Sequence, residues 1–525
     1  MTATSIHTVS PSPTRPEAWK GSPGPLDAAR RAGSPAWAAV AAVAIVLWGV
    51  DAATYMAVPE RVVLRSIALT VEYLAAVALI GSRYGRGYGL YQFRLGPWYL
   101  LLSAVTLGLT SITWRTPQAG VLAVIGPSSV AYALALLGLG VPLWTIGYLV
   151  GPGGLAFRAG HSLAALATSE RDGKGGGRYR PVAVWALAGV AVAARLTQIA
   201  IGRFGYLADP SQLVSNSSRY AQILEYAASL GLPALVIAAV ELARSGGARQ
   251  RTLFLVLLGT EIGFGLLSGV KGQFVFTLLA VCMSFAIVRG RLPLRWLLGA
   301  AAVLMFVVVP YNATYRQTVR PHADQNLSPS AAIAAAPQIL TQTIEGGGRD
   351  DEQSHNTLTD SADYLADRVR SVDSLAVVVQ KTPEVVPYRG TFELVSGTVL
   401  GWVPRALWPG KPVRTAGYTF SQEYYETPPG LYTSAGISPQ ADLFRYGGLL
   451  VMLVGSALLG AVCRFVDETL HPGRDLRLTA LFASLFTLLL TTETSVSDLV
   501  VLLPIKVGVV VLACRFVYRR RPVVA

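Results

Sequence analysis

The sequence predicts an all-α integral membrane protein, a polytopic helical bundle of about 12 transmembrane helices with one large, partly helical extracytoplasmic loop. Of 525 residues, 52% are hydrophobic and only 14% are charged, and the mean hydropathy is +0.46, well outside the balance of a soluble domain. Apolar runs of about 18 to 22 residues recur, each long enough to cross the hydrocarbon core. Strands that alternate polar and apolar residues are absent, so the spans are expected to be helices.

The expected spans follow one another through most of the chain. The approach to the fourth span is apolar but is interrupted by Gly126 and Pro127, which leaves a half-helix and an interfacial segment open as alternatives. In order, the spans are 36–58, 62–81, 97–113, 128–150, 181–201, 220–243, 251–268, 273–289, 293–310, 446–464, 476–492 and 498–517.

Lysine and arginine are distributed unevenly between alternate loops, and this predicts the orientation, because cytoplasmic loops are enriched in them. The pattern places both termini in the cytoplasm and the long loop outside the cytoplasmic membrane. The expected organisation is a disordered cytoplasmic tail (1–35), helices one to nine (36–310), the extracytoplasmic loop with the active-site elements (311–445), and helices ten to twelve with a short basic tail (446–525).

Charge, cysteine and histidine usage exclude several classes of protein. The net charge of +14 would suggest nucleic-acid binding in a soluble protein, but here the basic residues collect in short loops between apolar runs, so no nucleic-acid partner is expected. Cys282, Cys463 and Cys514 lie in or at the ends of apolar runs, which implies no disulfide framework. The five histidines have no zinc spacing, and no metal or other cofactor is expected.

The second half of the long loop has the pattern of a folded segment. Apolar residues from Ala362 to Val379 recur at helical spacing, and Thr382-Pro383 ends the pattern. Tyr388 to Thr391 turns the chain. The next residues, Phe392 to Val403, are apolar enough to lie against the membrane or dip into it.

Basic residues on the expected outer side suit a polyanionic head group, because the guanidinium fork pairs with two phosphate oxygens at once. A lipid diphosphate is the natural candidate. Lys271, in SGVKGQ, is expected near the start of a helix that favours anions, although it could instead extend to the interface. For Arg368 and Arg370 the alternative is a solvated helix face paired with nearby aspartates. The candidate diphosphate contacts are Lys271, Arg316, Arg320, Arg368, Arg370, Arg405 and Lys411.

The stretch WVPRALWPGKP, from Trp402 to Pro412, is unusual in so apolar a chain. Its prolines stiffen the backbone and its tryptophans favour the membrane interface, so Arg405 and Lys411 would be held at headgroup depth as a rigid cationic shelf. The alternative is an interfacial anchor that only orients the loop.

Charged residues inside spans are rarer. Arg195 and Lys506 are the best candidates to face a cavity within the membrane. A structural pairing with Glu261 or Glu225 is the alternative for each.

The chain resembles the oligosaccharide repeat-unit polymerases of bacterial surface polysaccharides, the O-antigen polymerase (Wzy-type) group. The pattern PRALWPGKP is the most specific part of the resemblance. In place of the acidic-aromatic-Asn-aromatic-Gly turn common in that group, this chain has ADLFRYGG, with Asp442 as the acid and Arg445 where Asn is expected. The resembling segments are Tyr311–Arg316, Asp367–Glu393, Pro404–Pro412, Gly202–Ser211 and SGVKGQ.

The resemblance implies transfer of a growing glycan from a polyprenyl diphosphate to a sugar hydroxyl of another lipid-linked repeat unit. Arginines would neutralise the leaving diphosphate without a metal. The candidate bases for the acceptor are Asp363, Asp373, Glu393, Asp442 and His355, of which Asp442 and His355 are chosen as the catalytic candidates. The implied partners are the polyprenyl-diphosphate-linked glycan, the lipid bilayer, a flippase and a chain-length regulator. A lipid-linked oligosaccharide flippase or other transporter, and a glycan ligase of the same architecture, remain alternatives. A lipid-to-sugar glycosyltransferase fits less well, because the first outer loop is too short to hold its site.

Overall fold

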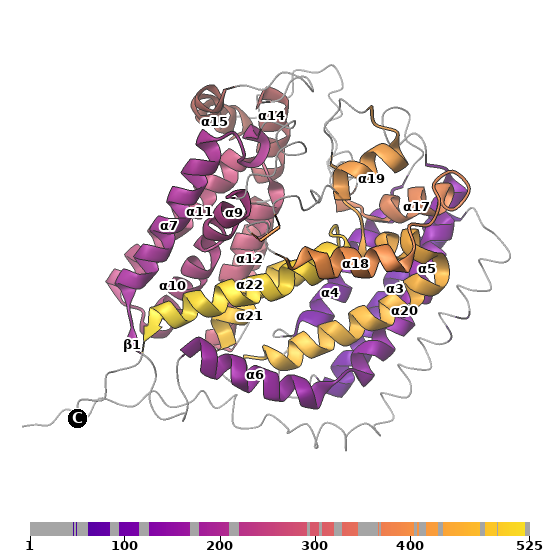
Figure 1. Ribbon diagram of the computed structural model, residues 1–525, viewed down its shortest axis with the longest axis horizontal. Helices are drawn as coiled ribbons and strands as arrows, with labels where there is room; N and C mark the ends of the chain where they lie inside the picture. Colours follow the sequence, from indigo (N-terminus) through magenta and orange to yellow (C-terminus); the bar gives the residue numbers. More distant parts are fainter. Residues whose placement is uncertain are drawn as a thin grey trace, which may run out of the picture.

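The structure is a computed structural model, and nearly all of what it describes is helical (Figure 1). It describes residues 46, 49, 61–84, 94–114, 125–168, 178–208, 220–290, 294–303, 307–319, 328–344, 366, 369–403, 407–408, 416–428, 434–472, 478–490 and 492–519.

The helices of the first half are α3 Val62–Tyr84, α4 Leu95–Ser103, the π-helix η3 Ala104–Gly108, the 3-10 turn η4 Leu109–Ser111, α5 Pro127–Val150, α6 Gly153–Thr168, α7 Pro181–Ala200, the 3-10 turn η6 Gly205–Leu207, α9 Ala221–Ala228, α10 Gly231–Ser245 and α11 Ala248–Ser268. Those of the second half are α12 Lys271–Arg289, α13 Leu294–Val303, α14 Val309–Val319, α15 Pro329–Ile344, α17 Val372–Lys381, α18 Thr391–Gly401, α19 Ala416–Tyr425, α20 Pro439–Thr469, α21 Thr479–Leu489 and α22 Val496–Val517. The two-residue strands β1 Arg178–Tyr179 and β2 Tyr518–Arg519 pair antiparallel.

Eight helices in the described part of the chain are long and apolar enough to cross a membrane. The prediction of a helical membrane bundle is therefore confirmed. These candidate spans are Val62–Gly81, Pro127–Val150, Pro181–Leu207, Ala221–Ser245, Ala248–Ser268, Gly272–Arg289, Pro439–Thr469 and Val496–Val517.

The other four predicted spans have different outcomes. All of 36–58 except residues 46 and 49 lies outside the described residues. The predicted span 97–113 corresponds to a shorter apolar helix, Leu95–Ser111. The span 293–310 falls on α13 and the start of α14, and α21, within 476–492, has 11 residues.

Two span beginnings are informative. Pro127 occupies the first turn of α5, where a missing N–H costs nothing, and the helix continues for 24 residues, so the fourth span is a full-length helix. The tenth begins at Pro439 rather than at residue 446, because Ser438 caps a helical turn that the polar composition of ADLFRYGG conceals. Gly447 and Gly448 then leave helical geometry and kink α20.

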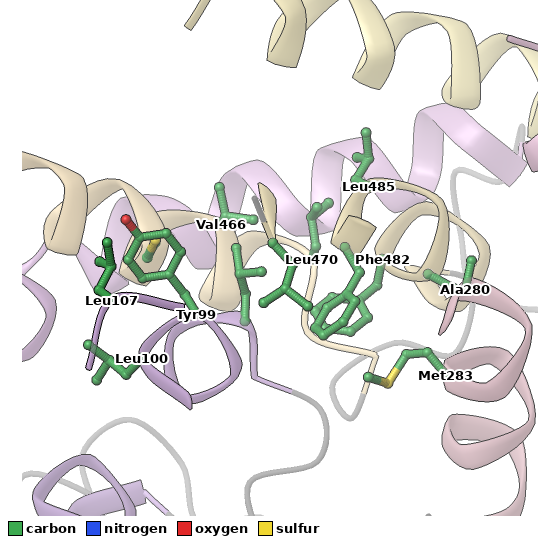
Figure 2. Packing of buried hydrophobic residues seen from close by; sticks show 14 of the residues in the cluster. Tyr99, Leu100, Leu107, Ala280, Met283, Val466, Leu470, Phe482 and Leu485 are labelled. Carbon is green, nitrogen blue, oxygen red and sulfur yellow. The ribbon is translucent and has the colours of Figure 1, made fainter. Parts of the chain in front are cut away.

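Close helix packing organises the core. α5 and α20 meet at glycines: a Cβ on Gly147 would overlap the carbonyl of Ala457, and one on Gly460 would overlap that of Trp144. Farther along the same core, α21 packs between the end of α20 and α12, and Figure 2 shows Phe482 lying between Leu470 and Met283.

The direction of the helices defines two ends of the bundle. β2 continues directly from the last residue of α22 and pairs with β1, which precedes α7, so the end of α22 and the start of α7 lie together. The start of α22 and the end of α7 therefore lie toward the opposite end. In Figure 1, α14, α15, α17 and α19 lie at that opposite end, away from β1.

Candidate functional site

Three sequence motifs that are far apart in the chain meet at the end of α7 and form what we call the Arg316 cluster: Tyr206, Gly269, Tyr311, Tyr315 and Arg316. Arg316 donates from Nε to the carbonyl oxygen of Gly269 at 3.0 Å, and its guanidinium carbon lies 4.3 Å from the ring centre of Tyr206. The hydroxyl of Tyr315 donates to the carbonyl oxygen of Leu267 at 2.8 Å. These contacts join GRFGYLADPS, SGVKGQ and YNATYR in one place.

A separate apolar core supports the Arg316 cluster. Tyr311 and Tyr315 stack with ring centres 5.5 Å apart and are fully buried within it. The arginine is thus presented from a rigid base. The core consists of Ile199, Phe204, Leu207, Tyr311, Tyr315, Val319, Ala332 and Ile339.

Backbone geometry explains Gly269 of this cluster and Gly205, which precedes Tyr206. Gly269 has φ +64°, and a Cβ there would lie 3.0 Å from the Tyr315 ring. Gly205 has φ +52°, and a Cβ would overlap the backbone of Ser268. Both positions need the left-handed region and close approach that glycine permits.

Lys271 is the first residue of α12 and follows Gly269 by two residues. The prediction that Lys271 lies near the start of a helix is therefore confirmed. A helix of 19 residues carries unpaired N–H groups and partial positive charge at that end. The structure therefore brings the start of a helix close to Arg316. The side chain of Lys271 lies outside the described part of the structure.

A second group, the Arg389 cluster, consists of Tyr388, Arg389, Glu423, Asp442 and Arg445. The N–H groups of Arg389 and Gly390 donate to the carbonyls of Arg445 and Tyr446, at 3.1 and 3.0 Å. Gly390 has φ +83° and forms the predicted turn. The segment PYRGTFE is thereby fastened to the ADLFRYGG turn.

Arg389 donates hydrogen bonds to two glutamates. Its Nη2 donates to both Oε1 and Oε2 of Glu423, at 2.7 and 2.8 Å, and its Nη1 donates to Glu393 at 3.1 Å. Burial lowers the pKa of Arg389, but the hydrogen bond and charge of Glu423 outweigh it and raise the pKa overall. The guanidinium therefore remains charged at the edge of this cluster.

Asp442 is fully buried and fully engaged. One carboxylate oxygen accepts from Arg445 Nε at 2.8 Å, and the other accepts from the N–H of Val496, at the first residue of α22, at 2.8 Å. The side chain thus joins the turn to the start of α22. To act as a general base, as the resemblance implies, Asp442 must first be released by one of these donors.

Arg370 lies close to the start of α17, where it is buried rather than solvated. Its Nε donates to Asp373 Oδ2 at 2.9 Å, and the indole of Trp114 donates to Asp373 Oδ1 at 3.0 Å. The predicted pairing with an aspartate is therefore confirmed, but on a buried face. Ser371 extends the contact through its N–H to the carbonyl of Thr106 in the π-helix η3.

The predicted shelf is only partly described. Trp402 donates from its indole to the carbonyl oxygen of Val500 at 3.3 Å, which ties the end of α18 to α22. α18 has 11 residues, too few to span, and exposes Phe392, Val395 and Val399 on one apolar stripe. The site residues that lie outside the described residues are Arg320, His355, Arg368, Arg405 and Lys411.

The candidates inside the membrane differ from each other. Arg195 donates from Nη1 and Nη2 to the two oxygens of Glu261, at 2.7 and 2.9 Å, so the structural pairing foreseen as its alternative is confirmed. Lys506 lies midway along α22 and is half-buried.

Sequence reasoning missed a buried network at the other end of the bundle. Asp467 accepts from the N–H groups of Leu95 and Gly96 and from the hydroxyl of Tyr148, while Arg94 and Glu468 pair at 3.1 Å. These acids follow the predicted end of the tenth span, and no spacing links them to residues more than 300 positions away. Glu423 was missed as well, because no spacing links it to Arg389, 34 residues earlier.

No group of three or more His, Cys, Asp or Glu side chains that could hold a metal ion occurs in the described ranges.

A family model described as "Domain of unknown function (DUF8712)" matches residues 194–495, more than half of the chain. The chain belongs to the DUF8712 family. The DUF8712 region begins one residue before Arg195 and ends at Ser495, the N-cap of α22, so both clusters lie within it. No curated protein and no solved structure matches the chain.

Proposed function

We propose that the chain polymerises polyprenyl-diphosphate-linked oligosaccharide repeat units at the outer face of the cytoplasmic membrane, as a member of the O-antigen polymerase (Wzy-type) group. The observation that carries the proposal is the position of the Arg316 and Arg389 clusters. They are built from the motifs on which the resemblance rests, and α14, which carries Arg316, and α19, which carries Glu423, lie at the end of the bundle away from β1 (Figure 1).

The Arg316 cluster has the chemistry for the donor diphosphate. Arg316 supplies a cation, and the start of α12 supplies N–H groups close to it. Lys271, the first residue of α12, supplies a second cation in this proposal. As the glycosyl bond breaks, negative charge grows on the leaving diphosphate, and fixed donors stabilise it without needing to reorganise. The reaction needs no metal for this step.

The Arg389 cluster is assigned to the parts of the substrate other than the donor diphosphate. Arg389 remains charged, and its side chain is 21% exposed in the ion pair with Glu423. The base for the acceptor hydroxyl is Asp442, once Arg445 or Val496 releases it, or His355. Arg405 and Lys411 complete the cationic edge in this proposal.

The full topology belongs to the same proposal. It has about 12 spans, both termini in the cytoplasm and residues 311–445 outside. The bilayer, a flippase that delivers repeat units and a regulator of chain length are the expected partners.

The decisive test uses cells from which the gene is deleted and then restored with variants. Arg316→Ala should leave single repeat units on the lipid carrier, because the donor diphosphate loses a charge-assisted contact. Arg251→Ala is the matched control, since Arg251 is exposed at the opposite end of α11 and should leave long polymer unchanged. Long polymer in cells that carry a membrane-inserted Arg316→Ala variant contradicts the proposal. Intact polymer that is not attached to its final acceptor in the deletion strain identifies a glycan ligase instead.

A further inference from the structure

A column of aromatic and charged side chains leads from the Arg316 cluster to one buried ion pair, Arg195–Glu261. Ile199, in the apolar base of that cluster, lies one helical turn after Arg195 on α7. Phe264 bridges the two levels: its ring centre is 5.9 Å from that of Phe204 and 5.1 Å from the guanidinium carbon of Arg195. Arg195 and Glu261 therefore lie directly below the cluster.

The start of α10 closes against this pair. A Cβ on Gly231 would overlap Glu261 Oε1 and lie 2.9 Å from Arg195 Nη2, so a side chain there would displace the paired ends of these residues. Gly231 follows α9 closely, and α9 packs against α7. The face of α9 is thus placed beside the column.

α9 combines apolar and polar side chains. It begins a candidate span, Ala221–Ser245, yet Glu225 is exposed on it. Tyr220, just before the helix, is 70% exposed, and Gln222 donates to the hydroxyl of Tyr226 at 2.5 Å. An exposed carboxylate within a span is stable where it faces water or a polar ligand, not hydrocarbon.

Lys506 supplies the opposite charge from α22. It is half-buried midway along a candidate span, and α7 packs against both α22 and α9, which carries Glu225. Opposite charges on two spans that pack against the same helix favour a polar space between them.

We propose that Tyr220, Gln222, Glu225 and Lys506 line a water-accessible vestibule that opens at the Arg316 end of the bundle and binds the hydroxyl-bearing sugar of the lipid-linked substrate. The sugar assignment rests on the proposed function, whereas the vestibule does not. The carboxylate and the ammonium balance each other, so the site suits neutral hydroxyl groups, which donate to Glu225 and accept from Lys506. A diphosphate would be repelled by Glu225. The tyrosine rings suit the apolar faces of a sugar.

Water access is tested by cysteine labelling in a variant whose Cys282, Cys463 and Cys514 are replaced by alanine. Glu225→Cys in intact cells should react with a membrane-impermeant maleimide at least about tenfold faster than Leu512→Cys, because a thiol in hydrocarbon does not ionise. Leu512 is the matched control, since it lies on α22 and is 66% exposed but apolar. Equal, slow labelling of the two overturns the vestibule. Labelling of Glu225→Cys only in inside-out vesicles overturns the direction of its opening.

The sugar assignment is tested by comparing Glu225→Gln with Glu225→Leu at equal membrane levels. Glutamine keeps the hydrogen bonding and should retain long polymer, whereas leucine should leave mainly single repeat units. Long polymer in Glu225→Leu cells overturns the sugar site even where the labelling succeeds. If cells with the wild-type chain make no polymer, the proposed function fails and the sugar site with it, while the labelling still decides the vestibule.

Discussion

Removing one partner of the Arg195–Glu261 pair should destabilise the chain far more than removing both. The side chains are only 8% and 10% exposed, and both oxygens of Glu261 are bonded to the guanidinium. Arg195→Met leaves a buried carboxylate without its partner, which costs about 3 to 5 kcal/mol, whereas the double variant Arg195→Met/Glu261→Leu leaves no buried charge and should recover most of this loss.

The assay is a double-mutant cycle on the free energy of unfolding in detergent. Arg389–Glu393 is the comparison pair, because its side chains are 21% and 50% exposed and Glu393→Gln should cost less than about 1 kcal/mol. If Arg195→Met costs as little as Glu393→Gln, the pair does not hold α7 to α11 and the reasoning is wrong.

Two further predictions concern the loops that frame the clusters. Gly269→Ala forces a Cβ into a left-handed conformation against Tyr315 and should lower stability by about 1 to 2 kcal/mol in thermal unfolding, whereas Gly259→Ala, in open space within α11, should be neutral or stabilising. The hydrogen bond from Lys381 (2.5 Å) and its charge lower the pKa of Glu426, so their stabilisation is present above the ordinary glutamate pKa of about 4.3 and is lost as the pH falls through the lower folded value. Glu426→Gln should therefore reduce the acid-induced loss of stability, measured as the free energy of unfolding at falling pH. If that loss is the same in Glu426→Gln as in the wild-type chain, the contact does not form.

Local patterns were sufficient for the features that depend on neighbouring residues. Long apolar runs predicted the eight membrane-length helices, and the end of α17 at Lys381 precedes Thr382-Pro383 as predicted. The pairing of Arg195 with Glu261 could be foreseen because few charges lie inside spans and each needs a partner.

Features that depend on distant contacts could not be predicted in this way. The early start of α20 is stabilised by Ser438, which contacts Ser374 at 3.0 Å, and the role of Asp442 depends on Val496, 54 residues later. The Arg316 cluster combines three motifs whose proximity no periodicity encodes. In each case burial and hydrogen bonding across the bundle decide the outcome.

Reconstitution of the purified chain tests the proposed polymerase most directly. Liposomes that contain the chain and lipid-linked repeat units should form glycans of several repeat units and release polyprenyl diphosphate, in the presence of a metal chelator as well as in its absence. Arg316→Ala liposomes should retain single repeat units. Transport of repeat units without lengthening, or polymer formation that Arg316→Ala does not reduce, would contradict the proposal.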